Sequence, residues 1–150
     1  WEMAPLPSCG TNKMENAAYD KPMPPLNRDS KPFWDSLKEH AMRLQRCADC
    51  GKIRHYPRPV CDSCYSMEVD WVRASGQGKV HSWTISHHAF HPGFLGNLPL
   101  MLLTVDMDEG VRICAQARDI KPEQLCVGLP VQLDYEDATG KLTLPVFHPA

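Results

Sequence analysis

The apolar side chains that follow the first thirty residues recur at the spacing of an amphipathic helix. They fall on one stripe, mostly at intervals of three and four residues: Phe33, Trp34, Leu37, Ala41 and Leu44. Ser30 or the preceding Asp29 can cap this helix, and Pro32 suits its first turn. The pattern therefore predicts a helix over residues 30–45. Its apolar face must be covered either by the core of this chain or by another subunit.

After Trp71 the spacing changes from helical to alternating, which is typical of strands. In the first expected strand, over 79–88, alternation places Val80, Ser82, Thr84 and Ser86 on one face and His81, Trp83, Ile85 and His87 on the other. An apolar run follows over 98–107, then the turn signal Asp108-Glu109-Gly110, strands over 111–118, 131–136 and 141–147, and one helical turn over 121–124. This pattern predicts a mostly β chain that ends in a small closed barrel of about five strands over residues 70–150.

Residues 1–29 differ from the rest of the chain in composition. They hold five prolines and seven scattered charges, so they cannot bury much apolar surface. We expect an extended arm or a disordered tail here. The first residue is Trp, and Met14 is a candidate initiator, which would place residues 1–13 outside the native protein.

Seven cysteines add chemistry to this picture, because four of them form the pairs Cys47-Ala-Asp-Cys50 and Cys61-Asp-Ser-Cys64. A gap of two residues lets both sulfurs of a pair turn toward one point. Four thiolates close a tetrahedral site and leave no position for water or substrate, so the metal is structural. The spacing predicts a zinc ribbon over residues 46–69, with iron in the same site or two disulfides as the alternatives.

The three remaining cysteines are Cys9, Cys114 and Cys126. An odd remainder, with no visible signal peptide and no apolar run long enough to cross a membrane, indicates reduced thiols in a cytoplasmic protein. Cys114 and Cys126 lie in apolar stretches, so we expect both to be core thiols.

The net charge of −2 is unevenly distributed along the chain. Six basic residues stand against two acidic ones between Lys38 and Arg58, whereas eight acidic residues stand against four basic ones from Met101 onward. The basic side chains of the ribbon region are Arg43, Arg46, Lys52, Arg54 and Arg58. Either they attract anions or an acidic partner surface, or they form a solvated charged face. The overall acidity argues against a dedicated nucleic-acid binder.

The loop over residues 90–99 is apolar, aromatic and rich in glycine and proline. It would expose Phe90 and Phe94, so it is predicted to form an interface or to line a ligand site, with packing on the chain itself as the alternative. His87 and His88 would point to opposite faces of a strand, so we expect polar positions at a strand end rather than a second metal site or a general base. The sequence holds no phosphate-binding loop and no serine-nucleophile motif, which favours a non-catalytic binding module.

The order of these motifs closely resembles a family in which a zinc ribbon precedes an OB-fold, long catalogued as a domain of unknown function. The likeness covers residues 31–149. It rests on Phe33-Trp34, on Leu44-Gln45-Arg46 directly before the first cysteine pair and on Pro57-Arg58-Pro59-Val60 directly before the second. Further along the chain it rests on Trp71, on Gly76-x-Gly78-x-Val80 and on the stretches 108–112 and 127–131. The resemblance implies a rubredoxin-like zinc ribbon and a C-terminal OB-fold barrel. Tyr65 departs from the family pattern, because a glycine is common after the last cysteine.

Members of that family accompany thiolase-superfamily enzymes that act on acyl-CoA thioesters. The resemblance therefore implies a non-catalytic accessory subunit in a hetero-oligomer, without a nucleophile of its own. A thiolase of aromatic-compound degradation, such as benzoylsuccinyl-CoA thiolase, is the expected partner, with a steroid side-chain aldolase or an acyltransferase as the alternative. A more remote alternative is an OB-fold protein that binds single-stranded nucleic acid.

The chemistry of the residues themselves suggests which side chains would make these contacts. The five basic side chains of the ribbon would meet the phosphates of CoA or an acidic patch of the partner. The apolar anchors on the partner would be Phe33, Trp34, Phe90 and Phe94.

Overall fold

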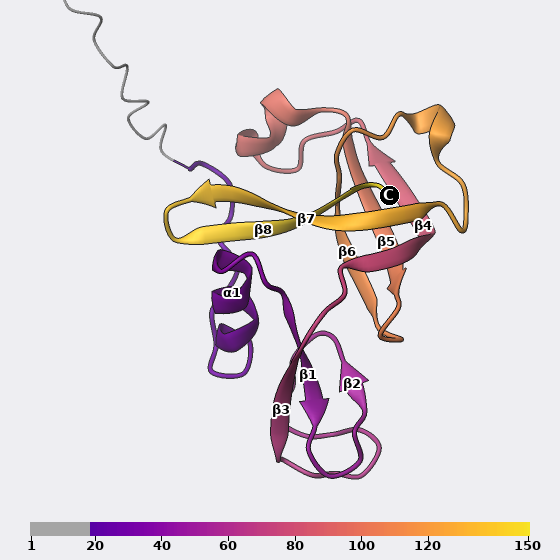
Figure 1. Cartoon of the computed structure of the whole chain (residues 1–150). Helices are drawn as coiled ribbons and strands as arrows, with labels where there is room; N and C mark the ends of the chain where they lie inside the picture. Colours follow the sequence, from indigo (N-terminus) through magenta and orange to yellow (C-terminus); the bar gives the residue numbers. More distant parts are fainter. Residues whose placement is uncertain (1–18) are drawn as a thin grey trace, which may run out of the picture.

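The computed structural model of the chain describes residues 19–150. The greater part of the predicted arm, including Cys9, therefore lies outside the described residues. The elements are α1 (Lys31–Lys38), β1 (Arg43–Cys47), β2 (Ile53–Arg54), β3 (Val69–Arg73), β4 (Gln77–Ser86), η1 (Pro92–Asn97), β5 (Leu100–Met107), β6 (Arg112–Ala117), η2 (Pro122–Gln124), β7 (Pro130–Thr139) and β8 (Leu142–Pro149). A short helix, a three-stranded ribbon and a closed five-stranded barrel confirm the predicted fold class (Figure 1).

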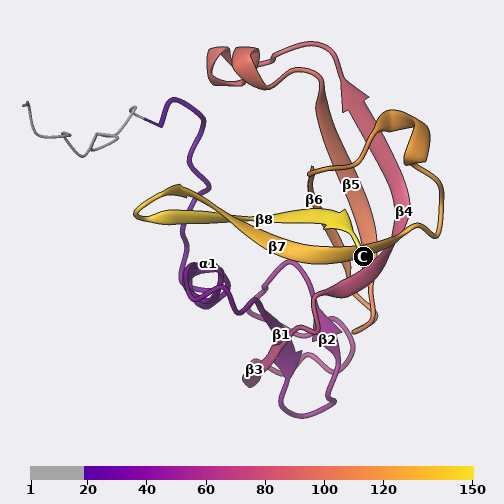
Figure 2. The same ribbon diagram turned by 45° about the horizontal axis from the view of Figure 1, so that its top comes forward.

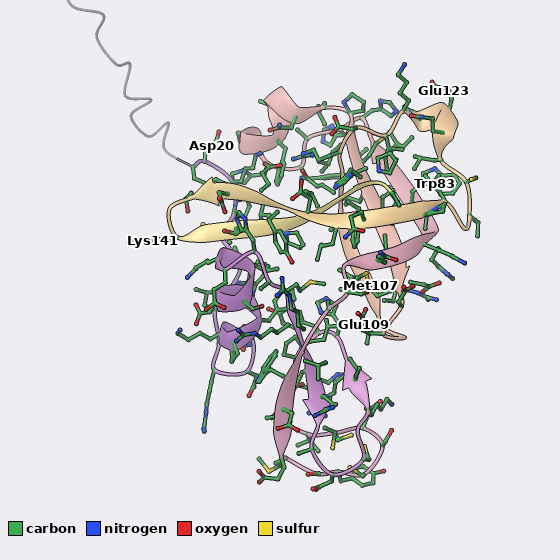
Figure 3. The ribbon with its side chains drawn as sticks, in the orientation of Figure 1. Asp20, Trp83, Met107, Glu109, Glu123 and Lys141 are labelled. Atoms are coloured by element: carbon green, nitrogen blue, oxygen red, sulfur yellow. The ribbon has the colours of Figure 1, made fainter. Side chains whose placement is uncertain are left out.

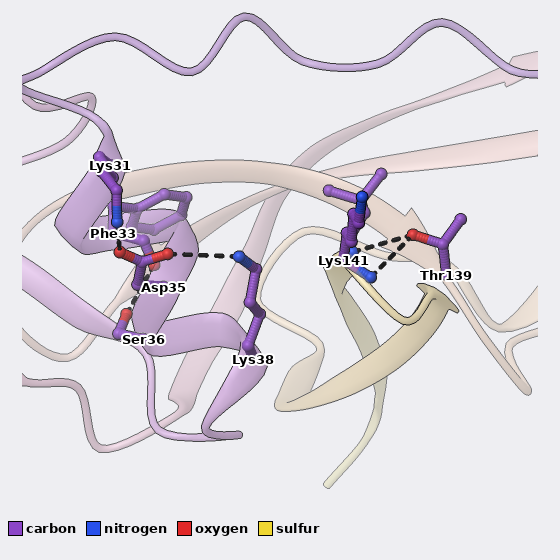
Figure 4. Close-up of polar contacts among 8 residues, drawn as sticks. Lys31, Phe33, Asp35, Ser36, Lys38, Thr139 and Lys141 are labelled. Atoms are coloured by element: carbon purple, nitrogen blue, oxygen red, sulfur yellow. Dashed lines mark hydrogen bonds and ion pairs between the residues drawn. The ribbon is translucent and has the colours of Figure 1, made fainter.

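The helix is shorter than predicted, because it ends at Lys38 rather than at residue 45. His40 has a left-handed backbone with φ of 50°, which breaks the helical path. The Ser36 hydroxyl donates to the Phe33 carbonyl and accepts the Arg43 amide, so it ties the end of the helix to the start of β1. Figure 4 shows this hydroxyl beside the ion pairs that Asp35 makes on the exposed face.

Leu44 lies outside the helix but is nevertheless buried. It lies in β1 opposite Val72 and is buried in the same apolar cluster as Phe33 and Leu37. The helix therefore packs on the core of its own chain. A helix followed by a strand can present the same apolar spacing as one longer helix. The spacing alone therefore predicted a helix that extends too far toward the C-terminus.

The ribbon is a sheet in the order β2-β1-β3 and is longer than the predicted 46–69. β1 pairs antiparallel with β3 from Arg43 opposite Arg73 to Cys47 opposite Val69. This sheet places the two cysteine loops at the end of the ribbon that points away from the barrel (Figure 1).

The predicted five-stranded barrel closes in the order β4-β5-β6-β8-β7, and its strands begin at Gln77 because Val69–Arg73 belongs to the ribbon. β6 and β8 run parallel over a short stretch, where Gln116 and Ala117 pair with Val146 and Phe147. Beyond the barrel, the β7–β8 hairpin continues over α1, which contacts β8 (Figures 1 and 2). The apolar core thus extends from the barrel through the hairpin to the helix.

The alternation predicted for β4 is interrupted by an irregularity between Val80 and Ser82. Val80 is fully buried and Ile85 packs against the same core, although simple alternation put them on opposite faces. A bulged residue shifts the parity of the strand by one, and periodicity in a single sequence does not reveal it.

The prediction that Cys114 and Cys126 are core thiols is wrong, because both are exposed. On β6 the inward positions belong to Ile113 and Ala115, so the residue between them points outward. In the loop after η2 the buried position is Leu125.

The described part of the arm, from Tyr19, contacts the loop that contains η1. The Asp20 carbonyl lies so close to Gly93 that a Cβ on this glycine would approach it to 2.7 Å. The Lys21 ammonium lies 5.4 Å from the centre of the Phe94 ring. Figure 3 shows Asp20 on the side of the molecule where the arm enters. In the described range 19–150, no helix is both long and apolar enough to span a membrane.

Candidate metal centre and contact surfaces

The four paired cysteines meet at the far end of the ribbon. All four Sγ atoms lie within 4.8 Å of one another. Cys47 Sγ is 3.5 Å from Cys64 Sγ, and Cys50 Sγ is 3.6 Å from Cys61 Sγ. Four sulfurs held tetrahedrally at about 2.3 Å from a zinc ion would be about 3.8 Å apart, so this donor set fits such an ion.

Two matching turns position these sulfurs. The Gly51 amide donates to the Cys47 carbonyl at 2.9 Å, and the Tyr65 amide donates to the Cys61 carbonyl at 3.0 Å. Gly51 and Tyr65 both have left-handed backbones, with φ of 74° and 59°. The tyrosine that replaces the usual glycine therefore adopts the glycine conformation and leaves the ligands in place.

Backbone amides lower the pKa of the two buried thiols. The Cys50 amide, and to a smaller extent the Asp49 amide, lowers the pKa of Cys47. The Ser63 and Cys64 amides lower the pKa of Cys61 to about 6. The Ser66 amide also lowers the pKa of Cys64, but the neighbouring sulfurs and burial together outweigh it and raise that pKa to about 12. Four thiolates this close repel one another, and a divalent cation removes the repulsion.

The two cysteine pairs are the only group of three or more metal-ligating side chains found within residues 19–150. His87, His88 and His91 belong to no such group. His81, on β4, instead contacts the Asp106 carboxylate at 3.0 Å. The described structure therefore gives the second metal site no support.

The five basic residues of the ribbon do not form one surface. Arg43 pairs with Glu39, Arg46 pairs with Asp70, and Lys52 pairs with Asp62. These pairs are exposed and each stabilises the fold only slightly.

Arg54 and Arg58 differ from the other three. Arg54 is only 3% exposed, which conflicts with the expected surface role. Arg58 is exposed, its backbone amide donates to the Gln45 side chain, and its guanidinium forms no ion pair within the described chain.

The four predicted aromatic anchors also differ in how exposed their side chains are. Phe33 is 2% exposed and belongs to the core, so it is not available to a partner. Trp34 is half-buried and donates its indole N–H to the Tyr56 hydroxyl at 2.8 Å. Phe90 is 89% exposed, whereas Phe94 is partly covered and lies beside Lys21.

Trp34 lines an apolar pocket of about 220 Å³ between α1 and the barrel. The other lining residues come from β5, β6 and β8 and include Leu102, Cys114 and Pro145. Sequence reasoning missed this pocket, because its walls come from strands that are distant in the chain and pair only after the barrel closes.

Comparison with known proteins supports this architecture. Residues 34–70 match the rubredoxin-like zinc ribbon domain of ChsH2, and residues 71–136 match the C-terminal OB-fold domain of ChsH2. A DUF35 domain-containing scaffold protein of Methanocaldococcus jannaschii is 31% identical over 101 residues, which cover 66% of this chain and 71% of that protein. The chain belongs to the ChsH2/DUF35 family. The predicted zinc-ribbon and OB-fold family is thereby confirmed.

A solved structure is similar over most of the chain. It is titled "Ltp2-ChsH2(DUF35) aldolase", and the match has a TM-score of 0.79 and 38% identity, covering 85% of this chain and 98% of that chain.

Two curated relatives are longer proteins. A probable enoyl-CoA hydratase alpha subunit of Thermomonospora curvata is 39% identical over 130 residues, and a 3-oxo-4,17-pregnadiene-20-carboxyl-CoA hydratase alpha subunit of Mycobacterium tuberculosis is 36% identical over 114 residues. The matches cover 87% and 76% of this chain but only 40% and 36% of those subunits.

Proposed function

We propose that this chain is a non-catalytic, zinc-binding accessory subunit of a thiolase-superfamily enzyme that makes or cleaves C–C bonds in acyl-CoA thioesters. The observation that carries the proposal is the likeness to a chain of the Ltp2-ChsH2(DUF35) aldolase, of which 98% is covered at 38% identity. An aldolase of the Ltp2 type is accordingly the favoured partner. The relatives reported above support this alternative better than a thiolase of aromatic-compound degradation.

The metal centre supports a structural role for the ion. All four ligands come from the protein, and a tetrahedral ion with four sulfur ligands keeps no open position for substrate. The ligands lie on two loops joined by short strands, so the ion would fix the end of the ribbon. We assign zinc rather than iron because the ribbon matches a zinc-ribbon domain.

Two exposed apolar surfaces support a docking role. The first is the pocket between α1 and the barrel, with Trp34 and Cys114 in its wall. The second is the loop around η1, in which Phe90 is 89% and Leu95 is 66% exposed. Apolar groups exposed in this way are typical of interface anchors.

The similarity to two hydratase alpha subunits supports an acyl-CoA context but not hydration by this chain. Those proteins are more than twice as long as the region that matches. The binding of single-stranded nucleic acid has weaker support, because the part of the sequence from Met101 onward carries twice as many acidic as basic residues.

Co-expression with an Ltp2-type aldolase tests the proposal. We expect the two proteins to co-purify as a complex that contains one zinc ion per copy of this chain. A chain that stays separate from the aldolase at micromolar concentrations would contradict the docking role. An absorption spectrum with iron–thiolate bands would contradict the assignment of zinc.

A further inference from the structure

A pocket of about 210 Å³ opens at the junction of the ribbon and the barrel. The ribbon contributes β2 and the loop around it, and the barrel contributes the turn between β5 and β6. In Figure 3 the labelled Glu109 marks this turn, directly above the ribbon. The charged and titratable residues in the lining are Lys52, Arg54, His55, Arg58, Asp62 and Arg112.

The charges around this pocket are not balanced within the described chain. Lys52 donates to the Asp62 carboxylate at 2.8 Å, and Arg112 donates to Asp106 at 2.6 Å, so both cations are paired. Arg54 and Arg58 form no ion pair within 4.0 Å among residues 19–150, although the charge of Arg58 contributes to lowering the pKa of Asp62. Neither guanidinium is therefore in contact with a carboxylate. His55 adds no charge near neutral pH, because burial lowers its pKa to about 4.

The buried, unpartnered side chain of Arg54 is the strongest indication that this pocket binds an anion. Its side chain is buried, and none of its three guanidinium nitrogens finds a hydrogen-bond partner in the described range. A buried charge without a partner is strongly disfavoured, and natural proteins pair such groups. A guanidinium is also the side chain best suited to hold an oxyanion through two parallel hydrogen bonds.

Glu109 is the competing partner within the chain. Its Oε1 accepts the Ser75 amide, and its Oε2 is buried without a hydrogen bond among residues 19–150. No ion pair within 4.0 Å joins it to Arg54. A direct pair between these groups is therefore not formed in this structure.

We propose that this pocket is an oxyanion site in which Arg54 and Arg58 bind a phosphate group. A phosphate dianion would neutralise both free guanidinium charges, whereas a carboxylate would neutralise one. The guanidinium nitrogens of Arg54 are closed off from solvent, so an anion reaches them only if side chains of the pocket lining shift. The site rests on the proposed function only for the source of the phosphate, which is either free in solution or part of a CoA thioester.

Calorimetric titration of the zinc-loaded full chain with inorganic phosphate, at constant ionic strength in chloride, tests the site. We expect one saturable site per chain. Arg58→Ala should weaken the affinity at least tenfold, and it tests the site without endangering the fold because this residue is exposed. Arg43→Ala is the matched control, because it removes an exposed ribbon arginine outside the pocket and should change the affinity less than twofold.

Two further titrants identify the source of the phosphate. If the 3′-phosphate of CoA occupies the site, CoA should bind at least tenfold more tightly than dephospho-CoA and should lose this advantage in Arg58→Ala. If the ligand is free phosphate, CoA and dephospho-CoA should bind no more tightly than inorganic phosphate. Either result supports the pocket as a phosphate site.

Three results would overturn the proposal. The first is the absence of saturable phosphate binding, or equal binding by Arg58→Ala and Arg43→Ala. The second is acetate binding as tight as phosphate binding, which would indicate a carboxylate occupant. The third is phosphate binding only after Glu109→Gln, which would show that Glu109 already neutralises Arg54. Because the chain is titrated alone, these failures leave the accessory-subunit proposal untouched, and a failure to co-purify leaves the anion site untouched.

Discussion

At the scale of single residues, backbone conformation at two positions shapes the metal centre. Gly51 and Tyr65 follow the second cysteine of each pair, and both adopt positive φ. Glycine enters this region without steric cost, whereas a side chain with a Cβ is strained there by about 1–2 kcal/mol. The ribbon accepts that strain at Tyr65, whose side chain is 80% exposed.

Gly51→Ala isolates this conformational cost. A Cβ at Gly51 would meet no heavy atom within 4 Å, so the strain comes from the backbone alone. We expect the free energy of unfolding of the zinc-loaded chain to fall by about 1 kcal/mol, measured by denaturant titration. Gly96→Ala is the control, because that site is equally open and has no positive φ. An equal effect at both glycines would contradict the account.

Removal of one ligand tests the role of the four cysteines as a single site. Cys61→Ser should abolish stoichiometric zinc binding and unfold the end of the ribbon, because a structural zinc site contributes about 10–16 kcal/mol to folding. Metal analysis and limited proteolysis of the loop over 48–68 would show both effects. Cys126→Ser changes an exposed thiol outside the site and should leave both unchanged. Full zinc content in Cys61→Ser would show that the site needs only three sulfurs.

At the scale of elements, the β7–β8 hairpin and the segment around α1 hold each other in place. The Asp137 carboxylate accepts the Thr143 hydroxyl at 2.6 Å and contacts His40 at 3.0 Å. The His40 ring stacks on Tyr135, whose hydroxyl accepts the Met42 amide at 2.9 Å. These contacts connect the end of the barrel to the start of the ribbon.

Asp137→Asn should therefore lower stability in a manner that depends on pH. The Thr143 hydrogen bond, followed by His40, lowers the pKa of Asp137 in the folded chain. A lowered carboxyl pKa contributes stability above the unfolded value of about 4, and that contribution is lost as pH falls through the folded pKa. The variant should be less stable than the parent at pH 6 and should approach it below pH 3, by thermal unfolding. Glu123→Gln, at the exposed η2, should show no such convergence.

The sequence was sufficient to predict most helices, strands and turns. It did not predict the features that tertiary contacts determine. The cysteine pairs predicted the metal centre, and the turn at Asp108-Glu109-Gly110 predicted the β5–β6 hairpin, because these signals are local. The end of α1 and the bulge in β4 were missed, since each is fixed by neighbours that spacing does not reveal. Burial of Arg54 between ribbon and barrel was invisible for the same reason.

At the scale of the whole molecule, the proposed docking role requires an apolar face of this chain to bind the catalytic partner. The pocket lined by Trp34 lies between the helix and the barrel, so a partner bound there would contact both parts of the chain. Its wall contains an exposed thiol, Cys114, that reports on access to this face.

Thiol labelling can locate the docking surface without any mutation. In the complex with an Ltp2-type aldolase, we expect maleimide to modify Cys114 at least tenfold more slowly than in the free chain, because the partner covers the pocket. Cys126 is also exposed but lies in the loop after η2, outside this pocket, and should react at an unchanged rate. Peptide mass spectrometry separates the two sites. Unchanged labelling of Cys114 in a stable complex would place the partner on another face.

The most direct measurement of the central claim is cleavage of a steroid-type acyl-CoA thioester by this chain, by an Ltp2-type aldolase, and by both together. The account predicts no turnover by the zinc-loaded chain alone and a rate for the mixture well above that of the aldolase alone, saturating at a fixed ratio of subunits. Turnover by the chain alone, or a mixture no faster than the aldolase alone, would contradict it.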